Sequence, residues 1–132
     1  MRLNRKAKGT TAERELIHMF WELEWAAMRA AGSGSQSHPS PDVMAGNAQR
    51  SLAIECKSVG DDAKYLTKEE VDQLILFART FGAEPWVGIR FSGRKWFFLN
   101  PEDMRETQKN FAITRDIAEM KGLSFFELTD TR

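Results

Sequence analysis

The stretch from Pro41 to Ser58 constrains the fold more than any other part of the sequence. It contains two short segments with strand composition, 42–46 and 51–58, joined by residues 47–50, which are typical of a turn. In the second segment the side chains alternate, with Leu52, Ile54 and Cys56 on one face and Ala53, Glu55 and Lys57 on the other. This pattern predicts an antiparallel hairpin with one apolar face and one charged face.

The charged face of this hairpin carries two acidic groups. A turn centred on residues 48 and 49 pairs positions whose numbers add up to 97, which places Asp42 opposite Glu55. Carboxylates so close together repel each other unless a divalent cation lies between them, and Mg²⁺ prefers such oxygen ligands. The ammonium of Lys57 can position or help deprotonate an attacking water, or stabilise the transition state. The group therefore indicates metal-assisted phosphodiester hydrolysis.

A simpler interpretation of the same residues is open. Charged side chains alternate on the solvated face of many strands, so the two acids and Lys57 can also be ordinary surface charges. The Pro41-Asp42 onset, the turn signal and the apolar opposite face favour the metal site. Cys56 lies on that apolar face, so we expect a small buried core residue rather than a nucleophile.

Periodicity and capping signals predict the remaining elements. The predicted helices cover 11–24, 67–82 and 114–121, and a further helix start lies at 100–103. The second of these helices begins with a capping-box pattern of Thr67 and Glu70. The predicted strands cover 25–28, 86–91, 94–99 and 123–128, with Ser92-Gly93 as a hairpin turn. The predicted irregular segments are the loop 32–41 and the polar connection 59–66. Together they predict an α/β fold with a mixed central β-sheet flanked by helices.

Length and composition narrow the class of protein. With 132 residues, 42% of them hydrophobic, the chain fits a single domain. Basic and acidic residues balance at 19 each, so any nucleic-acid site must be a local patch. The lone cysteine excludes an internal disulfide, and no apolar run is long enough to span a bilayer. We therefore predict a cytoplasmic protein with no membrane partner.

The first nine residues are basic and contain no acid. We predict a flexible basic arm over residues 1–9 and a single domain over residues 10–132. The side chains of the arm that can neutralise DNA phosphates are Arg2, Arg5, Lys6 and Lys8. The alternative is a disordered tail that only aids solubility.

The helix predicted over 67–82 has more apolar surface than one core needs. Val71, Leu74, Ile75 and Ala78 form a stripe that can face the core. A second seam consists of Leu74, Phe77 and Phe81, which predicts a surface for self-association. Burial of this seam beneath the C-terminal helix is an equally open alternative.

Several ordered blocks of the sequence resemble a known family. Pro41-Asp42 and Glu55-Cys56-Lys57 are similar to the signature of PD-(D/E)XK nucleases. The blocks 8–16, 29–33, 41–47 and 52–58, with further matching positions as far as residue 99, resemble the archaeal Holliday junction resolvases. The resemblance implies a restriction-endonuclease-like nuclease fold. It also implies a homodimer that makes paired nicks in four-way DNA junctions with Mg²⁺, for which Mn²⁺ can substitute.

The resemblance further implies roles for individual residues. The implied metal ligands are Asp42, Glu55 and the carbonyl of Cys56, with Glu13 completing the acidic site directly or through water. Lys57 would be the catalytic lysine beside these acids. The residues implied to contact DNA near the scissile bond are Arg14, Arg29 and either Ser33 or Ser35. A sliding clamp is a further candidate partner, which the sequence does not identify.

Glu13 has a second interpretation that does not involve catalysis. It stands three residues after Thr10, so it can be the glutamate of a capping box that bonds to the Thr10 amide. From the residue pattern alone this role is favoured, and the resemblance reverses that preference. One carboxylate cannot fully serve both roles.

Two other functions compete with junction resolution. A sequence-specific restriction-type endonuclease of the same fold is the nearest rival, but it would be expected to carry a target-recognition domain, for which this chain has little room. A non-catalytic junction-binding protein would have lost an acidic ligand or the lysine. Neither Asp42, Glu55 nor Lys57 is lost here.

Overall fold

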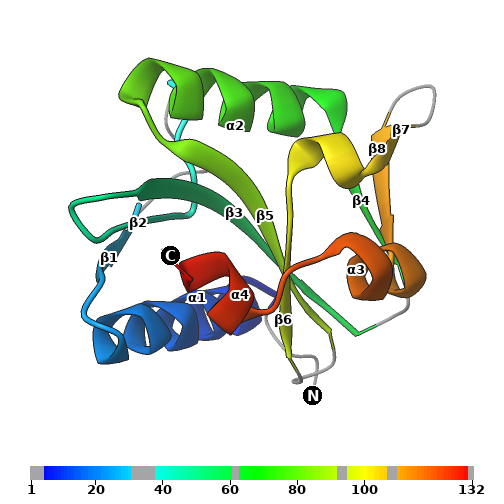
Figure 1. Ribbon diagram of the computed structural model, residues 1–132. Helices are drawn as coiled ribbons and strands as arrows, with labels where there is room; N and C mark the ends of the chain where they lie inside the picture. Colours follow the sequence, from blue (N-terminus) through cyan, green and yellow to red (C-terminus); the bar gives the residue numbers. More distant parts are fainter. Residues whose placement is uncertain (1–4, 31–37, 61–62, 92–94, 107–109, 131–132) are drawn as a thin grey trace.

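The computed structural model describes residues 5–30, 38–60, 63–91, 95–106 and 110–130. Figure 1 shows a central sheet between helix α2 (Lys68–Phe81) and helix α1 (Arg5–Glu22). In spatial order, the sheet consists of β1 (Ala26–Arg29), β2 (Val43–Gly46), β3 (Ser51–Val59), β5 (Glu84–Phe91) and β6 (Trp96–Leu99). A smaller sheet has the order β4 (Ala63–Thr67), β8 (Asn110–Thr114) and β7 (Arg105–Glu106).

Strand pairing in the main sheet is mixed, as the sequence predicts. Strands β3 and β5 are parallel, whereas the pairs β1–β2, β2–β3 and β5–β6 are antiparallel. In the β2–β3 hairpin Val43 pairs with Ile54, so partner numbers add up to 97 and the predicted register is confirmed. The turn is fixed by the Asn47 side-chain oxygen, which accepts hydrogen bonds from the backbone N–H groups of Gln49 and Arg50.

Each face of the main sheet has its own apolar core. The core on the α1 side includes Leu16, Phe20, Val43, Leu52, Ile54 and Phe98. The core on the α2 side includes Ala53, Val71, Leu74, Val87, Ile89 and Phe91. Because Ala53 is fully buried, the face of β3 that we expected to be charged is apolar at its beginning. The charged part of this face is confined to Glu55 and Lys57, because Val59 farther along the strand is again buried in the α2-side core.

Helix α1 begins at Arg5, six residues before its predicted start, and ends at Glu22 rather than at residue 24. The difference places residues 5–9 of the expected flexible arm inside a helix. Lysine, arginine and alanine are strong helix formers, so the run before Thr10 can continue the helix toward the N-terminus. As a result, Thr10 lies inside the helix and the predicted capping box with Glu13 is wrong.

The other predicted helices are mostly confirmed. Helix α2 has the predicted capping box between Thr67 and Glu70, and it ends at Gly82, whose φ is 91°. Helix α3 (Arg115–Lys121) is capped by Thr114 and closed at Gly122. The helix start at 100–103 yields only a single 3₁₀ turn, η2 (Pro101–Asp103). No helix within the described ranges is long and apolar enough to span a membrane.

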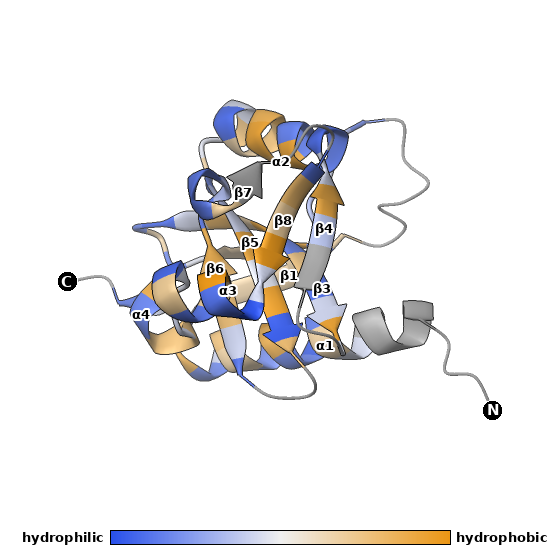
Figure 2. Ribbon diagram, turned by 90° about the vertical axis from the view of Figure 1, so that its right-hand side faces the viewer, coloured by the Kyte–Doolittle hydropathy of each residue, from blue (hydrophilic) through white to orange (hydrophobic). Residues whose placement is uncertain are grey.

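The C-terminal third differs most from the sequence prediction. The predicted strand over 123–128 is wrong, because helix α4 (Phe125–Thr129) occupies it and only Leu123 bridges to Phe98. A capping box between Ser124 and Glu127 starts this helix and outweighs the strand propensity of the aromatic run. The polar connection 59–66 is also wrong, because β4 lies there and pairs with β8, as Figure 2 shows.

Candidate active site

The acidic group predicted from the hairpin assembles where β2 begins. The backbone N–H of Asp42 donates a hydrogen bond to the Ile54 carbonyl at 3.0 Å. The Oδ2 atom of Asp42 accepts a hydrogen bond from the Cys56 backbone N–H at 2.8 Å. Asp42 is therefore tied to β3 on both sides of Glu55, in the register that the sequence predicts. Local strand pairing alone brings these two acids together.

Glu55 and Lys57 project from the same face of β3. The Lys57 Nζ atom lies 3.8 Å from Glu55 Oε2, and the two side chains are 20% and 18% exposed, respectively. Burial and the negative charges of Asp42, Glu70 and Glu13 raise the pKa of Glu55 to about 8, although Lys57 opposes this effect. The carboxylates of the site are thus insufficiently neutralised by the lysine alone.

Glu13 reaches the same region from helix α1. Its Oε1 accepts a hydrogen bond from Arg29 Nε at 2.9 Å, and Arg29 is the last residue of the neighbouring strand β1. Burial raises the pKa of Glu13, and the charge of Asp42 raises it further, whereas Arg29 lowers it. Glu13 therefore lies within electrostatic reach of the hairpin acids, consistent with the role that the resemblance implies.

Lys57 has a stronger partner, which the sequence analysis missed. Its Nζ donates a hydrogen bond at 2.9 Å to Oε2 of Glu70, in the first turn of α2. Burial lowers the pKa of Lys57, but the hydrogen bond and charge of Glu70 outweigh this and raise it. The capping-box pattern had already singled out Glu70. The missing signal was that the start of α2 lies over the charged end of β3.

Cys56 lies on the opposite side of β3 from Glu55. It packs against the α1 core with Leu52 and Ile54, as predicted. Burial raises the pKa of its thiol, and the charges of Asp42 and Glu13 raise it further. A buried neutral thiol is a poor metal ligand and nucleophile, so only the backbone of Cys56 is suited to the site.

The donor chemistry of the site fits a hard divalent cation. Two carboxylates from adjacent strands, with a backbone carbonyl beside them, are oxygen ligands of the kind that Mg²⁺ binds while keeping several waters. Over the described ranges, no three acidic, histidine or cysteine side chains converge closely enough to hold a metal ion. Glu13 is hydrogen-bonded to Arg29, and one oxygen of Asp42 accepts from the Cys56 amide. The protein therefore offers only a few oxygen ligands to a metal ion.

The residues expected to contact DNA are only partly placed. Arg14 is exposed on α1 directly after Glu13, and Arg29 is half-buried against Glu13. The Cα trace of α1 includes Arg5, Lys6 and Lys8, whose side chains lie outside the described residues. Arg2, Ser33 and Ser35 also lie outside them. The structure thus places Arg29 beside Glu13 and Arg14 on the surface of the same helix, and the other six residues stay predictions.

The seam expected for self-association is divided between core and surface. Leu74 is 3% exposed and belongs to the α2 core, so its assignment to a dimer contact is wrong. Phe77 is partly buried and stacks on Phe81, with ring centroids 5.6 Å apart. Phe81 is 60% exposed. The helical spacing does not distinguish these cases, because burial depends on the strands that α2 covers.

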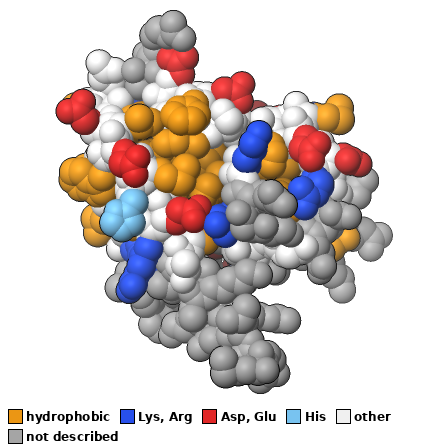
Figure 3. Space-filling view, turned by 90° about the horizontal axis from the view of Figure 1, so that it is seen from below, with side chains coloured by type: hydrophobic (Ala, Val, Ile, Leu, Met, Phe, Trp, Pro, Cys, Tyr) orange, Lys and Arg blue, Asp and Glu red, His pale blue; other side chains and the backbone are white. Residues whose placement is uncertain are grey.

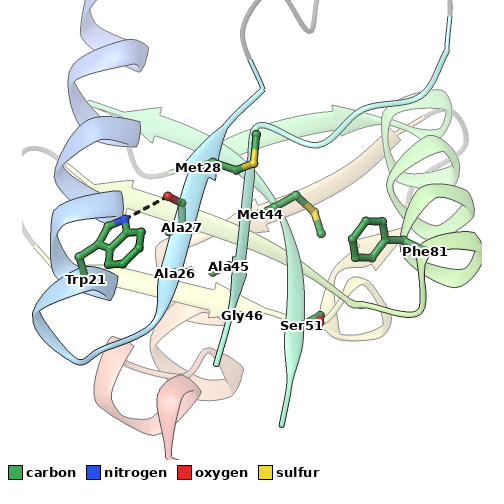
Figure 4. Close-up of a pocket in the computed structure, with 9 residues that line it drawn as sticks. All are labelled: Trp21, Ala26, Ala27, Met28, Met44, Ala45, Gly46, Ser51 and Phe81. Carbon is green, nitrogen blue, oxygen red and sulfur yellow. Dashed lines mark hydrogen bonds between the residues drawn. The ribbon is translucent and has the colours of Figure 1, made fainter. Parts of the chain in front are cut away.

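Phe81 borders an apolar pocket of about 360 Å³ at the edge of the sheet. Figure 4 shows Trp21, Met28, Met44 and Phe81 around the open faces of β1 and β2. Trp21, Met28 and Phe81 are each more than half exposed. We call these four residues the β1-edge surface. A surface so rich in large apolar side chains is typical of a protein–protein contact.

A second cavity, of about 530 Å³, lies between α1, β6 and the C-terminal helices. Apolar side chains such as Met19, Phe125 and Phe126 line it together with the acids Glu15 and Glu119. Figure 3 shows hydrophobic side chains gathered among charged ones on the face seen from below, where α1 lies. None of the predicted site residues borders this cavity.

A mixed sheet whose hairpin carries paired carboxylates and a lysine defines the class of restriction-endonuclease-like nucleases. Comparison with known families identifies one family within that class. A family model described as archaeal Holliday junction resolvase (hjc) matches residues 4–132. The chain belongs to this family of junction-cutting endonucleases, which confirms the resemblance seen in the sequence.

Individual relatives agree with the family match. The crossover junction endodeoxyribonuclease Hjc of Archaeoglobus fulgidus is 42% identical over 92% of this chain and 95% of its own. The enzyme of the same name from Methanocaldococcus jannaschii is 32% identical over 92% of this chain and 86% of its own. The solved structure of Archaeoglobus fulgidus Hjc superposes with a TM-score of 0.87 at 38% identity, covering 92% of this chain and all of that one.

Proposed function

We propose that this chain is a homodimeric endonuclease that resolves four-way DNA junctions by paired hydrolysis of phosphodiester bonds, with Mg²⁺ as its cofactor and Mn²⁺ as a substitute. The observation that carries the proposal is the group of Asp42, Glu55 and Lys57 at the open end of the β2–β3 hairpin. Membership of the junction resolvase family supports the choice of substrate.

The proposed metal ligands are Asp42, Glu55 and the carbonyl of Cys56, with Glu13 completing the set through water. When bound, the ion supplies Lewis-acid activation of the phosphate. Lys57 remains protonated at neutral pH, because the raised pKa of its ammonium lies above the ordinary value of 10.5. It therefore acts as a fixed positive charge that stabilises the negative charge developing on the attacked phosphate, rather than as a general base.

The arginines next to the acids serve to hold DNA. Arg14 is exposed beside Glu13 and can bind a backbone phosphate directly. Arg29 is held by Glu13, which fixes its guanidinium next to the acidic group. Contacts from Arg2, Arg5, Lys6, Lys8 and Ser33 or Ser35 remain predictions, as does a cytoplasmic location or binding to a sliding clamp.

A second copy of the chain is the proposed occupant of the β1-edge surface. Strand β1 is at the edge of the main sheet, and the exposed Trp21, Met28 and Phe81 surround it. Burying these side chains against their symmetry mates removes apolar area from water, which favours association. Paired cutting provides the functional reason, because two related strands of a junction need two active sites.

Cleavage of a synthetic immobile four-way junction tests the proposed function. With Mg²⁺, the wild-type protein is expected to nick two opposing strands, and gel sizing of each labelled strand reads out the positions. Without a divalent ion no cutting is expected. A linear duplex of the same sequences is the control substrate. Efficient cutting of this duplex would instead favour the restriction-type endonuclease, and metal-saturated binding without cutting would favour a non-catalytic junction-binding protein.

A further inference from the structure

Glu70 makes two sets of contacts with one carboxylate. Its Oε1 accepts a hydrogen bond from the Thr67 backbone N–H at 3.0 Å, as the glutamate of the α2 capping box. Its Oε2 accepts the hydrogen bond from Lys57 Nζ at 2.9 Å. A capping glutamate on an exposed helix normally needs only the first of these contacts. The second connects the start of α2 to the lysine of the proposed active site.

Lys57 lies between two carboxylates at unequal distances. Glu70 accepts its hydrogen bond at 2.9 Å, whereas the nearest oxygen of Glu55 is 3.8 Å away, beyond hydrogen-bond range. No other side chain in the described ranges accepts a hydrogen bond from Lys57. Without Glu70, the ammonium would therefore move toward Glu55. It would then occupy an oxygen that the proposed metal site requires.

The carboxylate of Glu70 is well fixed for this task. Its rotamer is held by the Thr67 backbone N–H, which donates to Oε1 at 3.0 Å and does not depend on the Thr67 side chain. One residue further along, Val71 is 1% exposed in the α2 core, so the first turn of the helix is anchored to the sheet. A side chain that is held by packing and by a second hydrogen bond restricts the position of its partner more than a free surface side chain does.

We propose that Glu70 is a positioning residue that holds the Lys57 ammonium away from Glu55 and keeps the Glu55 oxygens available to the metal ion. This inference rests on the proposed nuclease function. It assigns to the α2 capping box a role in the site besides starting the helix. Glu70 acts through Lys57 and does not itself touch the reacting atoms.

The variant Glu70→Gln separates the two contacts of Glu70. Glutamine has one side-chain oxygen, which can still accept from the Thr67 N–H, while its NH₂ group cannot accept from an ammonium. Thr67→Ala is the matched control, because it removes the side-chain half of the cap and leaves the carboxylate beside Lys57. Thermal unfolding followed by circular dichroism verifies that both variants are folded.

Two measurements test the role of Glu70. In Glu70→Gln, the cleavage rate of a four-way junction at saturating Mg²⁺ is expected to fall about 10–100-fold, with junction affinity unchanged. Calorimetric titration with Mn²⁺ in the absence of DNA is expected to show an affinity about tenfold lower. Thr67→Ala should stay within about twofold of wild type in both measurements. Wild-type rate and Mn²⁺ affinity in Glu70→Gln would overturn the proposal.

A double-mutant cycle with Lys57→Met distinguishes positioning from a purely structural effect. If Glu70 acts through Lys57, adding Glu70→Gln to Lys57→Met changes Mn²⁺ affinity by less than about twofold. An undiminished loss of affinity in this background would overturn the proposal, because Glu70 would then act without the lysine. If the wild type failed to cut junctions, the proposed function would fail, whereas the Mn²⁺ cycle would still decide the role of Glu70.

Discussion

The turn end and the open end of the β2–β3 hairpin differ in how their charges are partnered. At the turn, Arg50 forms two 2.8 Å contacts with the Glu84 carboxylate, donates to the Leu128 carbonyl at 2.6 Å, and lies 5.8 Å from the Trp25 ring centre. At the open end, four acids, Glu13, Asp42, Glu55 and Glu70, share Arg29 and Lys57 as neighbouring cations. Among the described residues, the charges at the turn end pair off, whereas the acids at the open end outnumber the cations.

The pKa values of the two ends reflect this difference. Hydrogen bonds from Arg50 lower the pKa of Glu84, so its ionised form is favoured in the folded protein. Burial and neighbouring acids raise the pKa of Glu55 to about 8, so its ionised form is disfavoured. The pairing of Arg50 with Glu84 at the turn end stabilises the folded protein. The burial of Glu55 beside other acids lowers stability, which is typical of a site that is arranged for binding a cation.

The largest expected difference between the two ends is in catalysis. Asp42→Asn or Glu55→Gln is expected to reduce junction cleavage by about 1,000-fold or more, because each removes a charged oxygen ligand. Junction binding, measured by gel shift in Ca²⁺, should stay close to wild type. Glu84→Gln at the turn end is the matched carboxylate control and should retain cutting. Cutting by Asp42→Asn at the wild-type rate would contradict the assigned ligand.

Self-association is expected to show the next largest effect. The β1-edge surface adjoins the turn end, because Gly46 and Ser51 line the same pocket. Phe81→Glu is expected to raise the dimer dissociation constant about 100-fold or more, since it places a charge in an apolar contact. Analytical ultracentrifugation measures this change. Phe126→Glu, which alters an aromatic residue that is 74% exposed on α4, is the control. Equal loss of the dimer in both variants would argue against the assigned surface.

Stability should respond at the turn end. Arg50→Ala removes the contacts to Glu84 and to the Leu128 carbonyl, so the free energy of unfolding is expected to fall by about 2 kcal/mol. Urea unfolding measures the change, and Arg79→Ala, at an exposed position of α2, is the matched control. The variant should still cut junctions where it is folded. A midpoint identical to wild type would mean that Arg50 does not tie α4 to the sheet.

The pH dependence of stability should have opposite signs at the two ends. In EDTA, the folded-state pKa of Glu55 is about 8, above its unfolded value of 4.5. The contribution of Glu55 to stability is therefore present below pH 4.5 and lost as the pH rises through 8. Glu55→Gln should therefore gain on wild type as the pH rises between these limits, by at most about 1.4 kcal/mol per pH unit, and keep that gain above pH 8. Chemical unfolding at several pH values measures this gain.

Glu84 provides the opposite case. Its folded-state pKa is lowered, so its contribution is present above pH 4.5 and is lost as the pH falls through the folded value. Glu84→Gln should therefore be less stable than wild type at neutral pH, with the difference shrinking in acid. A Glu55→Gln variant that showed this same trend would contradict the proposed excess of negative charge.

The sequence predicted the parts of the site that depend on neighbouring residues. The Asn47 turn and the alternation along 51–58 are local signals, and together they fix the register that joins Asp42 to Glu55. The α2 capping box is local too. Such features are encoded within a few residues, so they can be recognised without knowledge of the tertiary fold.

Features that depend on distant contacts escaped prediction. The hydrogen bond from Lys57 to Glu70 requires α2 to cross the end of β3, which no local pattern records. The burial of Leu74 and the exposure of Phe81 likewise depend on which strands α2 covers. In the C-terminal third, the Ser124–Glu127 box was a local signal that could have been found, whereas the pairing of β4 with β8 is long-range.

Strand β3 belongs to both apolar cores, with Ala53 in one and Ile54 in the other, and it pairs with a strand along each edge. Neither α1 nor α2 can separate from it without exposing one of those cores. Its amide hydrogens are therefore expected to exchange with solvent only when the entire domain unfolds. Glu55, which this strand carries, therefore keeps its spacing from Asp42 for as long as the protein is folded.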